Sequence, residues 1–193
     1  MFRVVVLPLM ILAVPACTPQ QVARPPLEGA KIGGPFALID QDGRPVTDAA
    51  FAGKYRIMYF GYTYCPDICP TDVQAIGAAM RTLEKDRPAV AARIVPVFVS
   101  VDPDRDTPVV VKTFVRAFYP RFVGLTGTPA AIKQAADAYG VYYAKGDKTP
   151  GGGYMVSHSR AAYLMGPDGK PIALLPVDGT ADGVVAELER WVQ

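Results

Sequence analysis

The chain has 193 residues, half of them hydrophobic and a fifth charged, and its 20 lysine and arginine residues against 18 acidic ones leave a net charge of +2. This length supports one well-buried core and is too short for two, so we expect a single domain. Charges of both signs are mixed along the chain without a run of like charge, which excludes the clustered cations that a nucleic-acid-binding surface needs.

Residues 1–16 have the features of an export signal. Arg3 supplies a positive charge, and residues 4–14 form an apolar run that is shorter than the ~20 residues needed to span a bilayer. The following "VPAC" looks like a bacterial lipoprotein cleavage box, although proline at its second position is atypical. It predicts that Cys17 becomes the lipidated first residue of the mature protein. The alternatives are an uncleaved anchor and a plain signal peptide, and all three place the domain outside the cytoplasm.

Residues 17–34 are rich in proline, glycine and polar residues, a composition that predicts a flexible tether to the domain at residues 35–193. A lipid on Cys17 would leave the domain with two cysteines, Cys65 and Cys69, which have no other partner for a disulfide.

Strands and helices are predicted to alternate through the domain. The first two strands flank a Gln41–Gly43 turn and form a hairpin, and the last two flank a Pro-Asp-Gly turn at Pro167–Gly169. Residues 145–153, with three consecutive glycines, show no periodicity and are predicted to be a mobile loop. The order indicates an α/β layered fold. The predicted strands are 36–40, 44–46, 55–63, 94–101, 122–125, 141–144 and two within 161–176, and the predicted helices are 71–84, 107–118, 129–139 and 182–192.

The two domain cysteines lie in "YCPDICPTD", between a buried strand and a helix. Cys69 is expected at the helix start, where free backbone N–H groups and the helix dipole favour a thiolate, so we predict a lowered pKa for Cys69. Asp72 is suited to capping this helix. Three intervening residues let the two sulfurs bind each other or a metal ion. A disulfide across so short a loop stabilises little, so we interpret the cysteines as a redox pair or half of a metal site.

His158 is the only histidine, and it lies between the glycine-rich loop and the strand that begins the terminal hairpin. In a thioredoxin-like sheet this segment faces the cysteine turn, at the place where thioredoxins have a cis-proline. Two thiolates and one imidazole suit copper best and zinc second. A structural zinc site usually needs a fourth protein ligand, so the small ligand set favours copper.

Other candidates are acidic residues and methionines. Asp102 and Asp106 follow the second buried strand in "SVDPDRDTP", which lacks the glycine and the distal glutamate of a calcium loop. Asp106 is predicted to be a helix N-cap, and Asp102 is a candidate for shaping or supplementing the metal site. Met80 is predicted to be core, whereas Met155 is a potential soft ligand without an assigned place.

Three segments together resemble the Sco/SenC family of copper proteins, which assemble the binuclear copper centre of cytochrome c oxidase. They are "YFGYTYCPDICPTDV", "FVSVDPDRDTP" and "YMVSHSRAAYLMGPDGK". The resemblance implies a thioredoxin-like three-layer sandwich with a central mixed sheet and an additional N-terminal hairpin. It implies one copper ion, Cu(I) or Cu(II), bound by Cys65, Cys69 and His158. It also implies membrane attachment on the periplasmic side, with lipid at Cys17 in place of the transmembrane helix that is common in the family.

The leading functional hypothesis is a monomeric metallochaperone that delivers copper to cytochrome c oxidase subunit II, with that subunit or another copper chaperone as its partner. The alternative is a thiol–disulfide oxidoreductase that keeps the cysteines of that copper site reduced, with Cys65 attacking and Cys69 resolving. A peroxide-reducing enzyme of the same fold is disfavoured, because the threonine and arginine around its single cysteine have no counterpart here.

Overall fold

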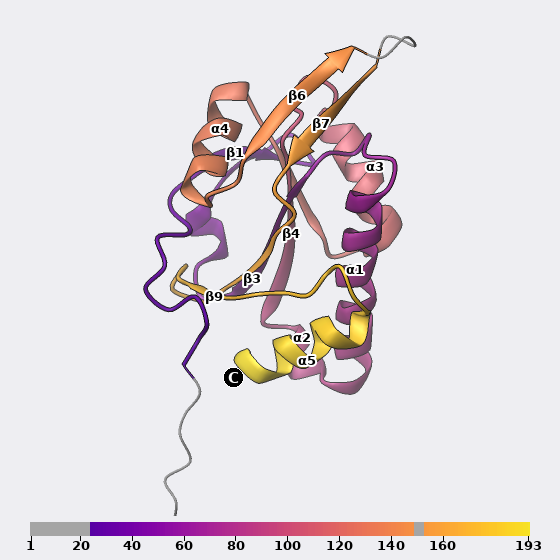
Figure 1. The fold of residues 1–193 in the computed structure, drawn as a ribbon. Helices are drawn as coiled ribbons and strands as arrows, with labels where there is room; N and C mark the ends of the chain where they lie inside the picture. The colour runs from indigo at the N-terminus through magenta and orange to yellow at the C-terminus, as the bar shows by residue number, and fades with distance from the viewer. Residues whose placement is uncertain (1–23, 149–152) are drawn as a thin grey trace, which may run out of the picture.

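The structure is a computed structural model that describes residues 24–148 and 153–193. Its middle layer is a seven-stranded mixed sheet with the strand order β2-β1-β5-β4-β3-β8-β9 (Figure 1). The pairs β3–β4 and β4–β5 are parallel, and the other neighbours are antiparallel. The strands are β1 (Ala37–Asp40), β2 (Pro45–Thr47), β3 (Tyr55–Gly61), β4 (Ile94–Ser100), β5 (Val123–Thr126), β8 (Ala162–Met165) and β9 (Pro171–Leu174).

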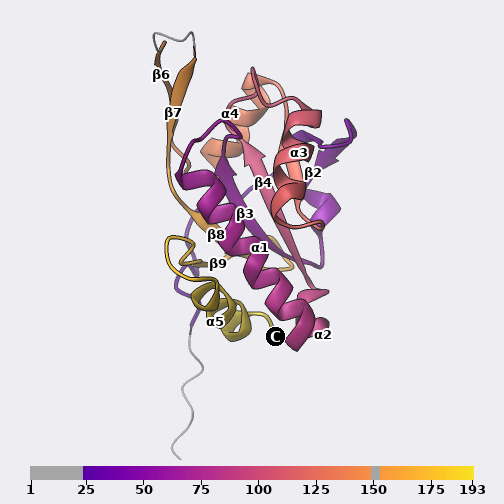
Figure 2. The ribbon, with the colours of Figure 1, turned by 90° about the vertical axis from the view of Figure 1, so that its right-hand side faces the viewer.

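Helices cover both faces of this sheet. Helices α1 and α3 lie on one face and α4 on the other, while α5 packs against α1 (Figures 1 and 2). The arrangement confirms the predicted three-layer α/β fold, with the β1–β2 hairpin added at one edge of the sheet. The helices are α1 (Ile68–Asp86), α2 (Pro88–Ala91), α3 (Pro108–Phe118), α4 (Pro129–Ala138) and α5 (Ala181–Trp191), with a 3-10 helix η1 (Asp48–Phe51).

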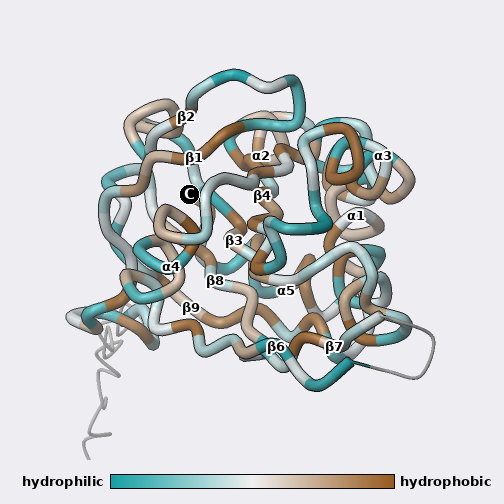
Figure 3. The backbone as a smooth tube through the Cα atoms, turned by 90° about the horizontal axis from the view of Figure 1, so that it is seen from above, coloured by the Kyte–Doolittle hydropathy of each residue, from teal (hydrophilic) through white to brown (hydrophobic). Residues whose placement is uncertain are grey.

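The central strands are hydrophobic because helices bury both of their faces. Every residue of β3 is buried, as are six of the seven residues of β4. Seen from above, hydrophobic β4 lies inside the molecule and the hairpin described below lies at its rim (Figure 3). The buried centre therefore holds the carboxyl end of β3 rigidly, and the cysteine turn begins there.

Helix α1 begins at Ile68, three residues before the predicted start at residue 71. Pro70 does not prevent this, because the backbone N–H groups of the first helical turn have no intrahelical acceptor and a proline there loses nothing. Cys69 consequently lies within the first turn of α1.

The prediction of a mobile loop over residues 145–153 is wrong for residues 145–148. These residues belong to β6 (Tyr143–Lys148), which pairs with β7 (Tyr154–His158) in a separate two-stranded sheet. The hairpin projects beyond the main sheet (Figures 1 and 2). The outer part of β6 is exposed on both faces, so it lacks the alternating apolar pattern that marks a half-buried strand.

The described part of the predicted tether, residues 24–34, makes backbone hydrogen bonds to the domain. Leu27 N–H donates to the carbonyl of Ile172, and Gly33 N–H donates to that of Ala138. The predicted signal and Cys17 lie outside the described residues. Within the described part of the chain, no helix has the length and hydropathy to span a membrane.

Candidate metal centre

Cys65 and Cys69 lie at the carboxyl end of β3, where the chain turns into α1. Both are free thiols, Cys65 half-buried and Cys69 fully buried. The backbone N–H of Cys69 donates to Sγ of Cys65 over 3.4 Å. Gly61 at the end of β3 makes room for the inner sulfur, because a Cβ there would lie 2.9 Å from Sγ of Cys69. The turn therefore holds both sulfurs against the strand end.

His158, the last residue of β7, reaches the inner sulfur. Its Nε2 lies 3.1 Å from Sγ of Cys69. Its Nδ1 lies 3.0 Å from the carbonyl oxygen of Ser159, which can only accept, so Nδ1 carries the proton and Nε2 presents its lone pair to the sulfur. Tyr62 packs edge-on against the imidazole, with ring centroids 5.8 Å apart. Burial lowers the pKa of His158, which keeps the ring neutral.

The pKa values of the two thiols are shifted in opposite directions, and the prediction of a lowered pKa for Cys69 is wrong. Burial raises the pKa of Cys69 to about 12. Burial also acts to raise the pKa of Cys65, but backbone N–H groups of Cys69, Asp67 and Ile68 outweigh it and bring that pKa below the ordinary value. The free N–H groups of the helix start thus point at Cys65, which precedes the helix, and leave Cys69 inside the first turn without their benefit.

Asp72 does not cap α1, contrary to the prediction. Its carboxylate is fully buried and accepts hydrogen bonds from Tyr59 Oη at 3.0 Å and from Arg160 Nε at 2.9 Å. A second Arg160 nitrogen lies 2.5 Å from the other carboxylate oxygen. This bidentate ion pair joins α1 to the segment two residues beyond His158. The sequence carried no periodic signal for it, because the partners are 88 residues apart.

Asp102 lies in a second polar cluster beside the cysteine turn. It accepts hydrogen bonds from Tyr154 Oη at 2.6 Å and from Arg105 Nε at 2.5 Å. Arg105 also donates to the Tyr154 carbonyl and lies over the rings of Tyr62, Tyr64 and Tyr154, at 5.8, 4.8 and 3.7 Å from their centroids. Asp102 is therefore linked to the site indirectly, because Arg105 contacts both Asp102 and Tyr62, and Tyr62 packs against His158.

Asp106 is not the N-cap of α3. Thr107 takes that position and accepts from the Val110 N–H, whereas the buried Asp106 carboxylate accepts from Thr63 and from Ser100. These bonds tie the loop after β4 to the cysteine turn after β3. The two loops meet because β3 and β4 are parallel and end at the same edge of the sheet.

A cleft of about 480 Å³ opens beside Cys65 and His158, and its lining also includes Tyr62, Ile68 and Met155. Met155 is 47% exposed, and its Sδ lies 3.8 Å from Tyr62 Oη. Met80 is fully buried, as predicted. Sequence reasoning missed Tyr62, although it lies in the quoted cysteine motif, because its contacts with β7 arise only in the folded chain.

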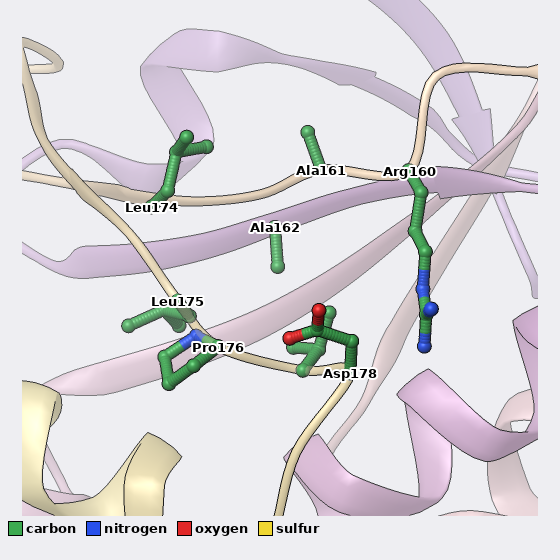
Figure 4. A pocket seen from close by; sticks show the side chains of 8 residues that line it. Arg160, Ala161, Ala162, Leu174, Leu175, Pro176 and Asp178 are labelled. Atoms are coloured by element: carbon green, nitrogen blue, oxygen red, sulfur yellow. The ribbon is translucent and has the colours of Figure 1, made fainter.

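A second cavity, of about 320 Å³, lies where β8 and β9 lead toward α5. Figure 4 shows Arg160 at one side of it, together with apolar side chains such as Leu174 and Pro176. Its lining contains no cysteine, histidine or methionine. Of these two cavities, the first cleft is therefore the one lined by potential ligands of a soft metal ion, namely Cys65, Met155 and His158.

The donor set of the first cleft fits a soft metal ion. Among residues 24–148 and 153–193, no three His, Cys, Asp or Glu side chains already form a closed metal site. Cys69 and His158 are nonetheless in contact, and Cys65 is joined to Cys69 by the hydrogen bond to its sulfur. Two sulfurs and an imidazole nitrogen suit Cu(I) or Zn²⁺ and do not suit ions that prefer oxygen.

Comparison with known proteins agrees with the resemblance. The SCO1/SenC family model matches residues 24–193. Protein SCO1 homolog 1 of Arabidopsis thaliana is 42% identical over 166 residues, which cover 84% of this chain and 48% of the relative. The chain thus spans about half the length of that relative.

Solved structures of the family share the fold. ScoI of Bradyrhizobium japonicum, solved with copper bound, is 40% identical with a TM-score of 0.75, and the match covers 83% of this chain and 99% of that one. BsSco, described as a Sco-family cytochrome c oxidase assembly protein with a disulfide switch, is 26% identical with a TM-score of 0.64, covering 89% of this chain and 97% of that one. The family model covers well over half of the chain, and the chain therefore belongs to the SCO1/SenC family.

Proposed function

We propose that this protein is a copper metallochaperone for cytochrome c oxidase assembly, and that Cys65, Cys69 and His158 bind the ion. The observation that carries the proposal is the 3.1 Å approach of His158 Nε2 to the Cys69 sulfur, with the Nε2 lone pair directed at that sulfur. The copper-bound ScoI structure supports it. We further propose that the ion passes to oxidase subunit II, and that lipid on Cys17 holds the protein at the periplasmic face of the membrane.

The different pKa values of the two thiols set the order in which they bind copper. Cys65, with its lowered pKa, supplies a thiolate first, while Cys69 loses its proton only when a cation compensates for its burial. The neutral imidazole completes the set without a proton to lose. Because one thiol is half-buried and opens on the cleft, a partner's ligands can approach copper from that side and replace the protein's ligands in turn.

Titration of the reduced protein with Cu(I) tests the ligand set. A Cys17→Ser background leaves Cys65 and Cys69 as the only thiols, and His158→Ala removes the imidazole. One equivalent is expected to bind in the background protein, and affinity is expected to fall in the alanine variant. Equal affinity and stoichiometry in the two proteins would contradict a role for His158. Ser159→Ala, which keeps the carbonyl that orients the ring, is the matched control and is expected to bind normally.

The second candidate function is thiol–disulfide exchange. The unequal acidities of Cys65 and Cys69 favour it, since an acidic half-exposed thiol followed by a buried one is the arrangement of an attacking and a resolving cysteine, and BsSco carries a disulfide switch. His158 separates the two functions. A reductase is expected to keep its activity in His158→Ala, whereas a chaperone is expected to lose copper.

A further inference from the structure

Met155 is a soft donor at the cleft that the three-ligand site does not use. It lines the same cleft as Cys65 and His158, and its side chain is 47% exposed. Three other described methionines, Met58, Met80 and Met165, are fully buried in the core. Met155 is thus the described methionine whose thioether an ion arriving from solvent can reach.

Tyr62 contacts both this thioether and His158, one of the proposed copper ligands. Its hydroxyl lies 3.8 Å from Sδ of Met155, and its ring packs edge-on against the imidazole of His158 at 5.8 Å. Among these sulfur atoms, exposure falls from Met155, at 47%, to the half-buried Cys65 and then to Cys69, which is fully buried behind the cleft lining.

A thioether at the rim has the chemistry of a transient Cu(I) ligand. It is soft and neutral and carries no proton, so it binds Cu(I) at any physiological pH and releases it to a thiolate, which is the stronger donor. We propose that Met155 is an entry ligand, which binds Cu(I) before the ion moves to Cys65, Cys69 and His158 and again as it leaves. This inference rests on the proposed copper-binding function.

The transfer is a ligand exchange without electron transfer. The bond between copper and Sδ of Met155 breaks as a bond to Sγ of Cys65 forms, and copper stays Cu(I). Any proton on the accepting thiol passes to solvent. Because an entry ligand contacts the ion only on the way in and out, its loss slows loading and unloading equally and leaves the equilibrium affinity unchanged.

Met155→Leu tests this, since leucine keeps the apolar surface of the rim and removes the sulfur. In the reduced Cys17→Ser protein, loading from a Cu(I)–chelator complex, followed by stopped flow, is expected to slow at least about fivefold, with affinity within about twofold. Leu174→Ile, at an exposed apolar residue outside this cleft, is the control and is expected to load at the normal rate. Unchanged loading in Met155→Leu would overturn the inference, and so would a change in affinity equal to the change in loading rate, which would make Met155 a permanent ligand.

Methyl-¹³C-methionine NMR gives a readout that does not depend on transfer. In His158→Ala, where the inner set lacks its nitrogen, one equivalent of Cu(I) is expected to shift the Met155 methyl resonance and leave the buried methionines in place. A resonance that stays unmoved in this variant would contradict the entry role. If the parent protein bound no copper at all, the proposed function itself would fail, which is a different and separately visible result.

Discussion

At the scale of single residues, the two thiols of the cysteine turn differ in pKa and in burial. Cys65 receives the backbone N–H groups at the start of α1, whereas Cys69 is buried and meets an imidazole. We expect iodoacetamide to alkylate Cys65 first, because the reactive species is the thiolate and the pKa of Cys69 is about 12.

Peptide mass spectrometry of the reduced, metal-free protein checks this order of reaction. The alkylation rate of Cys65 is expected to rise with pH through a midpoint below that of an ordinary cysteine, because its pKa is lowered. Cys69 is expected to react only after unfolding. Alkylation of Cys69 before Cys65 in folded protein would show that Cys69, and not Cys65, is the more acidic thiol.

The buried carboxylate of Asp72 is a second residue-scale feature. Asp72→Asn keeps the shape and an acceptor for Tyr59 but removes the charge that holds Arg160. The Arg160 side chain is 38% exposed and can turn to water, so the expected loss of unfolding free energy is about 1–3 kcal/mol, less than for a fully buried broken pair.

Urea denaturation measures this loss. The control is Asp168→Asn, at an exposed carboxylate paired with Lys170, where the expected change is within about 0.5 kcal/mol. An Asp72→Asn protein as stable as the parent would contradict a structural role for the ion pair.

At the scale of elements, the β6–β7 hairpin carries His158 but forms a sheet of its own, so its position depends on side-chain contacts with the domain. Arg105 provides several of them, through its stacking on Tyr154 and its hydrogen bond to the Tyr154 carbonyl. Arg105→Lys keeps a cation beside Asp102 and loses the planar stacking group. We expect faster amide exchange in β7, corresponding to a loss of about 0.5–2 kcal/mol of local stability.

Hydrogen exchange followed by mass spectrometry checks this prediction. Arg121→Lys is the matched control, because Arg121 pairs with Glu84 away from the hairpin, and exchange in β7 is expected to stay normal there. If Arg105→Lys left β7 protected, contacts other than Arg105 would have to hold the hairpin in place.

At the scale of the whole molecule, bound copper would join the start of α1 to the end of β7 and so stabilise the folded state. At a free copper concentration about 100 times the dissociation constant, the expected gain is about 2.7 kcal/mol, reduced by any binding to unfolded thiols. Calorimetry of the reduced protein with and without Cu(I) measures it. His158→Ala is expected to show a smaller rise in melting temperature, because the metal then contacts α1 and its preceding turn only. An equal rise in both proteins would mean that copper does not link the two segments.

The sequence by itself determined the α/β order of the main-sheet strands and of helices α1, α3, α4 and α5, and the identity of the candidate ligands, whereas the three-layer, thioredoxin-like form was implied by the family resemblance. The apolar runs of β3 and β4, the turn residues of the first and last hairpins, and the cysteine motif are local patterns, and local patterns follow from steric and hydrophobic preferences of neighbouring residues. The prediction that His158 would face the cysteine turn is matched by its contact with Cys69.

The tertiary structure alone decided which thiol is acidic, what Asp72 and Asp106 bind, that residues 145–148 form a strand, and where Met155 lies. Each of these depends on burial or on partners far away in the chain, such as Arg160 for Asp72 and Tyr62 for Met155. Burial and long-range contacts set desolvation and hydrogen bonding, and these quantities do not exist for a residue until the whole chain has packed around it.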